Sequence, residues 1–191
     1  MIENNWITLV KPNKVDYKIS ENKKFGTVVI EPLEKGFGTT LGNSLRRVLL
    51  SSLQGTAITS IKINGVLHEF STIEGVREDV TDIIMNLKNV TFNSKSNHTQ
   101  KLSLNVKGPK EVLSSDFDEN PDVEIIDKEA VIMNVDSNRE VNLEIFLNIN
   151  KGYISAEKSK ENESKSVGQI ILDATFSPVK RVSFNLSLIH I

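Results

Sequence analysis

The sequence predicts an α+β fold in which many short strands accompany two amphipathic helices. Apolar residues recur at helical spacing in two stretches only, 39–53 and 74–88. Elsewhere, apolar and polar residues alternate in short runs, which is typical of an antiparallel sheet and not of a doubly wound parallel one. Turn-forming residues separate these runs at short intervals, as they do in strand-rich domains.

The composition is that of an ordinary globular protein. The chain has 191 residues, of which 38% are hydrophobic and 25% charged, and this suits one average domain or two small ones. Its net charge of -2 gives no electrostatic argument for binding DNA or RNA. Cysteine is absent, so disulfides and thiolate metal sites are excluded. No apolar run approaches the roughly 20 residues that a bilayer requires, so we expect no membrane segment. The absence of cysteine is compatible with a reducing cytoplasm, where we expect the protein.

The first part of the chain is predicted to form strands and then a helix. The strands are expected at 6–10, 15–19 and 27–31. The helix is expected to begin at Thr39 or Thr40, because either side chain can accept a hydrogen bond from the free amides of the first turn. It is expected to end near Gln54-Gly55, where glycine suits a left-handed terminal position.

This first helix is expected to have two different faces. The face predicted to meet the core carries Leu41, Leu45, Val48, Leu49 and Ser52. The opposite face carries Asn43, Arg46, Arg47 and Leu50. Helical arginines are usually salt-bridged surface residues, but a leucine among them favours a second surface that meets a partner.

The rest of the chain is predicted to consist of strands around one further helix. A strand at 57–63 is expected to turn at Asn64-Gly65 and to pair with 66–70, because this dipeptide is a strong hairpin signal. The second helix is predicted at 74–88. Later strands are expected at 101–106, 123–126, 130–133, 141–149, 169–173 and 179–186, with loops at 116–121 and 157–166.

Candidate chemistry is sparse along the chain. Gly36, Gly38 and Gly42 follow a strand and open a helix, which resembles a phosphate cradle and leaves a small nucleotide-binding enzyme as an alternative. The lysine of a P-loop is absent, since Asn43-Ser44 occupies its place. The three histidines are far apart, and no nucleophile, acid–base pair or metal motif is evident. We therefore predict no catalytic residue, cofactor or metal in this chain.

The first helix and its preceding turn also resemble a known family. The segment Glu31-Pro-Leu-Glu-Lys-Gly-Phe-Gly-Thr-Thr-Leu-Gly-Asn-Ser-Leu-Arg-Arg-Val-Leu-Leu-Ser-Ser52 is similar to the signature of the N-terminal domain of the bacterial RNA polymerase alpha subunit. Further matching motifs follow in order: Asn64-Gly-Val-Leu-His-Glu-Phe-Ser-Thr72, Glu74-Gly-Val-Arg-Glu-Asp-Val80, Asn86-Leu-Lys88, Asp122-Val-Glu-Ile125, Gly152-Tyr-Ile154 and Asp173-Ala-Thr-Phe-Ser-Pro-Val179. The resemblance extends from about Val10 to Asn185.

The resemblance implies a non-catalytic assembly subunit of the DNA-directed RNA polymerase, a nucleotidyltransferase whose catalytic residues lie in other chains. In this family two alpha chains form a homodimer, one of which binds the beta subunit and the other the beta-prime subunit. The family fold is a dimerisation domain with an antiparallel sheet, built from both chain ends, and an inserted β-rich α+β domain. Here the former corresponds to 1–54 and 177–191, and the latter to 55–176.

Site residues follow from the resemblance by position. The beta-subunit interface corresponds to Asn43, Arg46, Arg47 and Leu50. The beta-prime interface corresponds to Lys88 and Leu172, and the dimer interface to Phe37, Leu41 and Leu53. The family's acidic activator-contact loop falls near 157–166, where lysines here alternate with glutamates.

The tail departs from the family pattern. After Asn185 the family continues into a dimerisation helix, a linker and a DNA-binding domain, whereas this chain reads Leu186-Ser-Leu-Ile-His-Ile191. We therefore expect an incomplete dimerisation domain and no direct DNA binding. A truncated chain that does not assemble is a further alternative.

Overall fold

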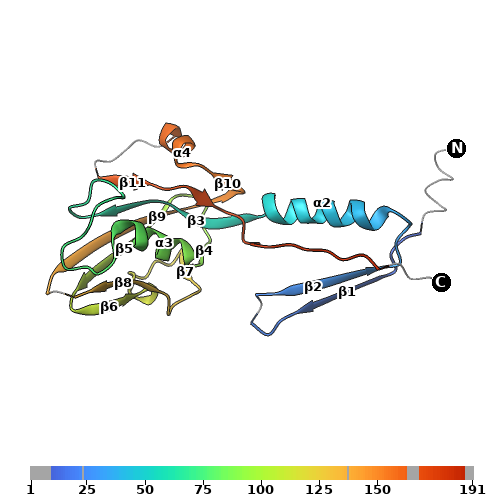
Figure 1. Cartoon of the computed structure of the whole chain (residues 1–191), viewed down its shortest axis with the longest axis horizontal. Helices are drawn as coiled ribbons and strands as arrows, with labels where there is room; N and C mark the ends of the chain where they lie inside the picture. Colours follow the sequence, from blue (N-terminus) through green and yellow to red (C-terminus); the bar gives the residue numbers. More distant parts are fainter. Residues whose placement is uncertain (1–9, 23, 137, 163–167, 188–191) are drawn as a thin grey trace. The chain divides into compact units, whose positions relative to one another are not determined.

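The computed structural model describes residues 10–22, 24–136, 138–162 and 168–187, and it divides into two compact units (Figure 1). The first unit comprises the described residues of 10–48 and 181–187. The second is Leu49–Lys180. The fold is mixed α+β with antiparallel strand pairs throughout the described ranges, as the sequence predicts.

In the first unit, a β-hairpin precedes a helix. β1 (Lys14–Ile19) pairs antiparallel with β2 (Gly26–Glu31), which confirms the strands predicted there, whereas the strand predicted at 6–10 lies outside the described residues. Directly opposite residues share one face of a ladder, so Tyr17 and Val28 lie on an apolar face. Tyr17 is 74% exposed, so this face has little cover within the described residues.

The helix that follows, α2 (Phe37–Ser51), differs from its predicted limits. It begins before Thr39, because Gly36 adopts a left-handed conformation (φ 88°) and turns the chain directly into the helix. It also ends earlier than predicted, since Gly55 belongs to the following strand and has no left-handed conformation. The last turn of α2 falls in the second unit.

The predicted core-facing stripe of α2 is wrong for the described structure. No residue of α2 is buried, and Leu45 and Val48 are both exposed. The described part of the first unit contains only one hairpin and the segment 181–187 besides this helix, and a two-stranded hairpin is too small to enclose a helix face. The strand predicted at 179–186 is also wrong, because these residues pair with no described strand.

The second unit is built on a four-stranded antiparallel sheet in the order β11-β3-β9-β5 (Figure 1). Its strands are β3 (Gln54–Ile63), β5 (Gln100–Lys107), β9 (Glu140–Lys151) and β11 (Gln169–Ile171). Burial alternates along β9, where Val141, Leu143, Ile145 and Leu147 face the core, as their spacing predicts.

Three short strand pairs complete the second unit together with three helices. The pairs are β4 (Phe92–Ser94) with β7 (Val123–Ile125), β6 (Lys110–Leu113) with β8 (Val131–Val135), and β10 (Tyr153–Ile154) with β12 (Ala174–Thr175). The helices are α3 (Val80–Asn89), the short η1 (Ser114–Asp116) and α4 (Ala156–Asn162). The loop predicted at 157–166 is therefore wrong in its first part, which is helical, and 163–167 lies outside the described residues.

Helix α3 supplies the other side of the core. Its buried residues are Val80, Ile83, Ile84 and Leu87, as the predicted periodicity requires. The helix begins at Val80 instead of residue 74, because Gly75 turns the chain (φ 83°) and Val76 forms a bridge with Val135. Asp79 caps the helix by accepting a hydrogen bond from the Asp82 amide at 2.7 Å.

The predicted hairpin after β3 is only half correct. Gly65 adopts a left-handed conformation and Val66 donates to the Ile63 carbonyl, so a turn is present. Residues 66–70 form no strand, however, because β9 and β11 already occupy both edges of β3.

Among the helices of the described ranges, none has the length and apolar character needed to cross a bilayer.

Candidate functional site

Helix α2 carries the first set of predicted site residues, which we call the helix surface: Asn43, Arg46, Arg47 and Leu50. Their spacing of three, four and seven residues places them on one side of the helix. Asn43 and both arginines are exposed, and Leu50 is half-buried. Guanidinium groups bind carboxylates with two parallel hydrogen bonds, and a nearby leucine supplies apolar contact. This side of α2 can therefore bind an acidic and partly apolar protein surface.

Another side of the same helix is occupied by the chain itself. The Phe184 ring lies on Gly42, so that a Cβ atom there would be 2.6 Å from Phe184 Cδ2. Leu186 lies on Gly38 in the same way, at 2.7 Å from the corresponding Cβ position. Both glycines are inside the helix and are covered by apolar groups, and only Gly36 is in a turn. The described residues thus do not form the glycine-rich phosphate loop that the nucleotide-binding alternative requires.

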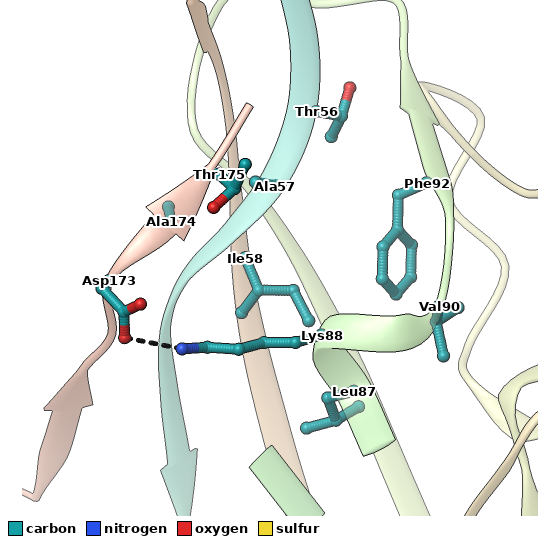
Figure 2. Close-up of a pocket in the computed structure, with 10 residues that line it drawn as sticks. All are labelled: Thr56, Ala57, Ile58, Leu87, Lys88, Val90, Phe92, Asp173, Ala174 and Thr175. Carbon is teal, nitrogen blue, oxygen red and sulfur yellow. Dashed lines mark hydrogen bonds and ion pairs between the residues drawn. The ribbon is translucent and has the colours of Figure 1, made fainter. Parts of the chain in front are cut away.

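The second set of predicted site residues consists of Lys88 and Leu172. They lie beside a small hollow in the second unit, and Figure 2 shows this hollow. The hollow has a volume of about 150 Å³ and lies between β3, the end of α3 and the segment around β12. Its lining consists of Thr56, Ala57, Ile58, Leu87, Lys88, Val90, Phe92, Asp173, Ala174 and Thr175. Apolar residues such as Phe92 and Ile58 are buried, whereas Lys88 and Asp173 are exposed at its edge.

An ion pair joins two parts of the chain at this edge. Lys88 Nζ donates to Asp173 Oδ1 at 2.6 Å (Figure 2). This hydrogen bond holds the pKa of Asp173 below its ordinary value, although partial burial of the carboxylate acts in the opposite direction. Both side chains are a third or more exposed, so the pair is a surface feature and adds little to stability. We call Lys88, Asp173 and Thr175 the hollow edge.

Leu172, the other predicted beta-prime contact, has a different environment from Lys88. Its side chain is 5% exposed and belongs to the hydrophobic core, and its amide donates to the Thr59 carbonyl at 2.8 Å. Leu172 therefore holds the backbone next to Asp173, and it is Asp173 that faces outward. Sequence reasoning missed the role of Asp173, because its partner Lys88 is 85 residues away and no local pattern joins the two.

Of the three predicted dimer residues, Phe37 and Leu41 lie on α2, whereas Leu53 follows the helix and belongs to the second unit. Phe37 is 51% exposed, while Leu41 and Leu53 are half-buried. In the first unit, Phe37 and the apolar face of the β1–β2 hairpin leave large apolar side chains exposed, among them Tyr17 and Val28. Large exposed apolar patches of this kind usually mark protein–protein contacts.

One further polar contact within the described ranges has a structural explanation. Glu78 accepts hydrogen bonds from the Asn134 amide at 2.6 Å and from Asn134 Nδ2 at 2.7 Å. Burial acts to raise the pKa of Glu78, but the two hydrogen bonds from Asn134, a further backbone hydrogen bond and the charge of Arg77 together outweigh it, so the pKa lies below its ordinary value. This contact ties the segment before α3 to β8. Within the same ranges, no group of three or more acidic, histidine or cysteine side chains could hold a metal ion.

Comparison with known protein families places part of the chain in a described family. A family model described as the RNA polymerase Rpb3/RpoA insert domain matches residues 61–177, which is more than half of the chain. The match begins within β3 and ends just after β12, so it covers α3, the hollow edge and most of the four-stranded sheet. The helix surface lies before the matched region.

Proposed function

Because the chain belongs to the Rpb3/RpoA insert-domain family and is an RNA polymerase alpha-type subunit, we propose that it is a non-catalytic scaffold on which the polymerase assembles for transcription. In this proposal the chain takes part in nucleotidyl transfer only as a subunit, and the large beta and beta-prime subunits supply the catalytic groups. Its place in the cell is the bacterial cytoplasm or the interior of an organelle with a bacterial-type polymerase.

We propose that the chain ends, 1–54 and 177–191, make contact with a second copy of the chain, and that 55–176 is the inserted domain. The exposed apolar groups of the first unit support this division. None of its described residues is buried, whereas the second unit has a continuous core. A hairpin and a helix with no buried residue cannot be stable alone in water. We propose that a second copy of the chain packs against Phe37, Leu41 and Leu53.

The helix surface is the proposed contact for the beta subunit. The observation that carries this assignment is the exposed pair Arg46 and Arg47 beside Leu50 on one side of α2. Arginine is enriched among the residues that dominate protein interfaces, and the neighbouring leucine adds apolar contact area. The hollow edge is the proposed contact for the beta-prime subunit, with Lys88 and Asp173 facing the partner and Leu172 holding the local backbone.

Capture of the purified large subunits by the full chain tests this function. Arg47→Ala is expected to weaken binding of the beta subunit at least about tenfold, since loss of an interface arginine commonly has effects of this size. Arg139→Ala is the matched control, because Arg139 is also an exposed arginine but lies in the second unit, paired with Glu74 at 2.7 Å. Equal losses in both variants, or none in either, would contradict the assignment of Arg47.

Two alternatives predict different results in the same preparation. A nucleotide-binding enzyme would gain thermal stability with ATP or a dinucleotide, whereas a scaffold would not. A truncated chain that does not assemble would sediment as a monomer or aggregate and would capture neither large subunit. The covered glycines of α2 favour the scaffold over the nucleotide-binding alternative.

A further inference from the structure

Two large side chains of the extended segment 181–187 have nearly the same spacing as two glycines on one face of α2. Gly38 and Gly42 are four residues apart, which corresponds to a rise of about 6 Å along a helix. Leu186 and Phe184, which cover them in that order, are two residues apart, or about 6.6 Å in an extended chain. The two elements therefore run in opposite directions with one large side chain for each glycine. We call this arrangement the glycine seat.

The closer of the two contacts is at Gly42. Three atoms of the Phe184 ring, Cδ2, Cγ and Cε2, lie within 2.6–2.9 Å of the position that a Cβ atom would take. An aromatic ring has few degrees of freedom with which to avoid such an atom, whereas the end of the Leu186 side chain can rotate away. Glycine is also the poorest helix former after proline, so two interior glycines weaken α2 as an isolated helix. Direct contact of the Phe184 ring with the helix backbone gives a reason for glycine at position 42.

The glycine seat is next to the helix surface on the same helix. Gly42 immediately precedes Asn43 and is one turn before Arg46, so a side chain that contacts Gly42 borders the predicted beta contact. Any rotation or shift of α2 against Phe184 would move these polar groups with it. Phe184 is 37% exposed, and its ring contacts the helix backbone at Gly42. Since none of the described α2 residues is buried, this contact is one of those that hold the helix within the described first unit.

We propose that Phe184, seated on Gly42, is a positioning residue for capture of the beta subunit. It fixes α2 in the orientation in which Asn43, Arg46 and Arg47 meet the partner together. This proposal rests on the proposed function of the helix surface. It adds that the segment 181–187, which is not part of the helix surface, sets the orientation of that surface.

The test compares capture of the purified beta subunit by the full chain and its variants. Gly42→Ala adds a methyl group under the Phe184 ring and is expected to weaken capture at least about fivefold. Gly26→Ala is the matched control in the first unit, because its new Cβ atom meets the Lys18 carbonyl oxygen at an ordinary 3.7 Å. Capture by this control should stay within about twofold of the unaltered chain.

A second variant separates positioning from folding. Phe184→Ala removes the ring without introducing a clash and is also expected to weaken capture. Because both substitutions disturb one contact, the double variant should lose less than the product of the two single effects. Phe184→Tyr keeps the ring on Gly42 and should keep capture, which a general loss of fold would not predict.

The outcomes distinguish this proposal from the function on which it rests. If Gly42→Ala raises the melting temperature and leaves capture unchanged, glycine at 42 is only a weak helix former and the proposal is wrong. Unchanged capture by Phe184→Ala also overturns it. If the unaltered chain captures no beta subunit, the proposed function fails. Hydrogen exchange of the α2 amides then decides whether the seat exists: faster exchange in Gly42→Ala supports it, and slower exchange refutes it.

Discussion

Substitution of Gly55 by alanine is expected to destabilise the second unit strongly. Gly55 lies at the start of β3, opposite Asn150 of β9, and an added Cβ atom would be 2.0 Å from the carbonyl oxygen of Phe176. Real Cβ atoms essentially never come within 3.0 Å of another heavy atom, so the two backbones must separate by about 1 Å, from 2.0 to 3.0 Å. The atom that is met belongs to a backbone, which cannot rotate away.

Neither backbone is free to move by this distance. The Phe176 amide donates to the Gly152 carbonyl at 2.7 Å, and its side chain is only 2% exposed. Overpacking of this kind costs about 1–3 kcal/mol, and contact with a fixed backbone places it near the upper value. Alanine also restricts the unfolded chain, which offsets about 0.4–1 kcal/mol. The expected net loss in the free energy of unfolding is therefore about 2 kcal/mol.

Urea unfolding followed by far-UV circular dichroism measures this loss. Gly65→Ala serves as the control in the same unit, because its Cβ atom would meet nothing within 4 Å and only the left-handed conformation (φ 80°) is strained. That strain costs about 1–2 kcal/mol. The restriction of the unfolded chain by alanine also offsets about 0.4–1 kcal/mol of this strain. Hydrogen exchange at the β3 amides should therefore accelerate more in Gly55→Ala than in the control. An unfolding midpoint for Gly55→Ala equal to that of the unaltered chain would refute the close approach of β3 and Phe176.

Three further predictions concern polar contacts of the second unit. Asn134→Ala removes the Nδ2 donor to Glu78 but keeps the backbone amide donor, and it should cost about 1 kcal/mol. Because the folded pKa of Glu78 is lowered, its contribution is complete above the unfolded pKa and disappears as the pH falls through the folded pKa, so acid titration of stability should be flatter in this variant. Asp79→Ala removes the cap of α3 and should cost about 1 kcal/mol by urea unfolding. Lys88→Ala or Asp173→Ala should change stability by less than about 1 kcal/mol but weaken beta-prime capture, and an unchanged capture would contradict the hollow edge.

The elements that sequence predicted correctly are those whose partners follow from their own alternation or periodicity. β9 and α3 each have a regular apolar pattern, and both have the buried residues that the pattern requires. The start of α3 was predicted too early, because Val76 fits the helical spacing although it bridges Val135 of β8. That bridge joins residues 59 positions apart, from 76 to 135, and no local propensity can indicate it.

Local turn signals also could not predict contacts between residues that are far apart in the sequence. Asn64-Gly65 does form a turn, but whether the next residues pair with β3 depends on which strands occupy the edges of β3. These strands, β9 and β11, come from much later in the chain. The candidate site also depends in part on residues that are far apart in the sequence. The helix surface of α2 could be predicted from one helix, whereas the pairing of Lys88 with Asp173 depends on tertiary structure.

The failure of one prediction is informative about function. Apolar periodicity predicts that one face of a helix packs against other apolar residues. It does not indicate whether those residues belong to the same chain or to a partner. In the second unit the chain covers such faces itself, and the predicted residues of α3 are buried. In α2 an equally regular pattern has no buried residue, and the β1–β2 hairpin likewise leaves Tyr17 and Val28 exposed. The same physical rule therefore holds in both units only if the apolar residues that pack on the first unit come from outside the described residues, and the proposed assembly role would supply them from a second copy of the chain.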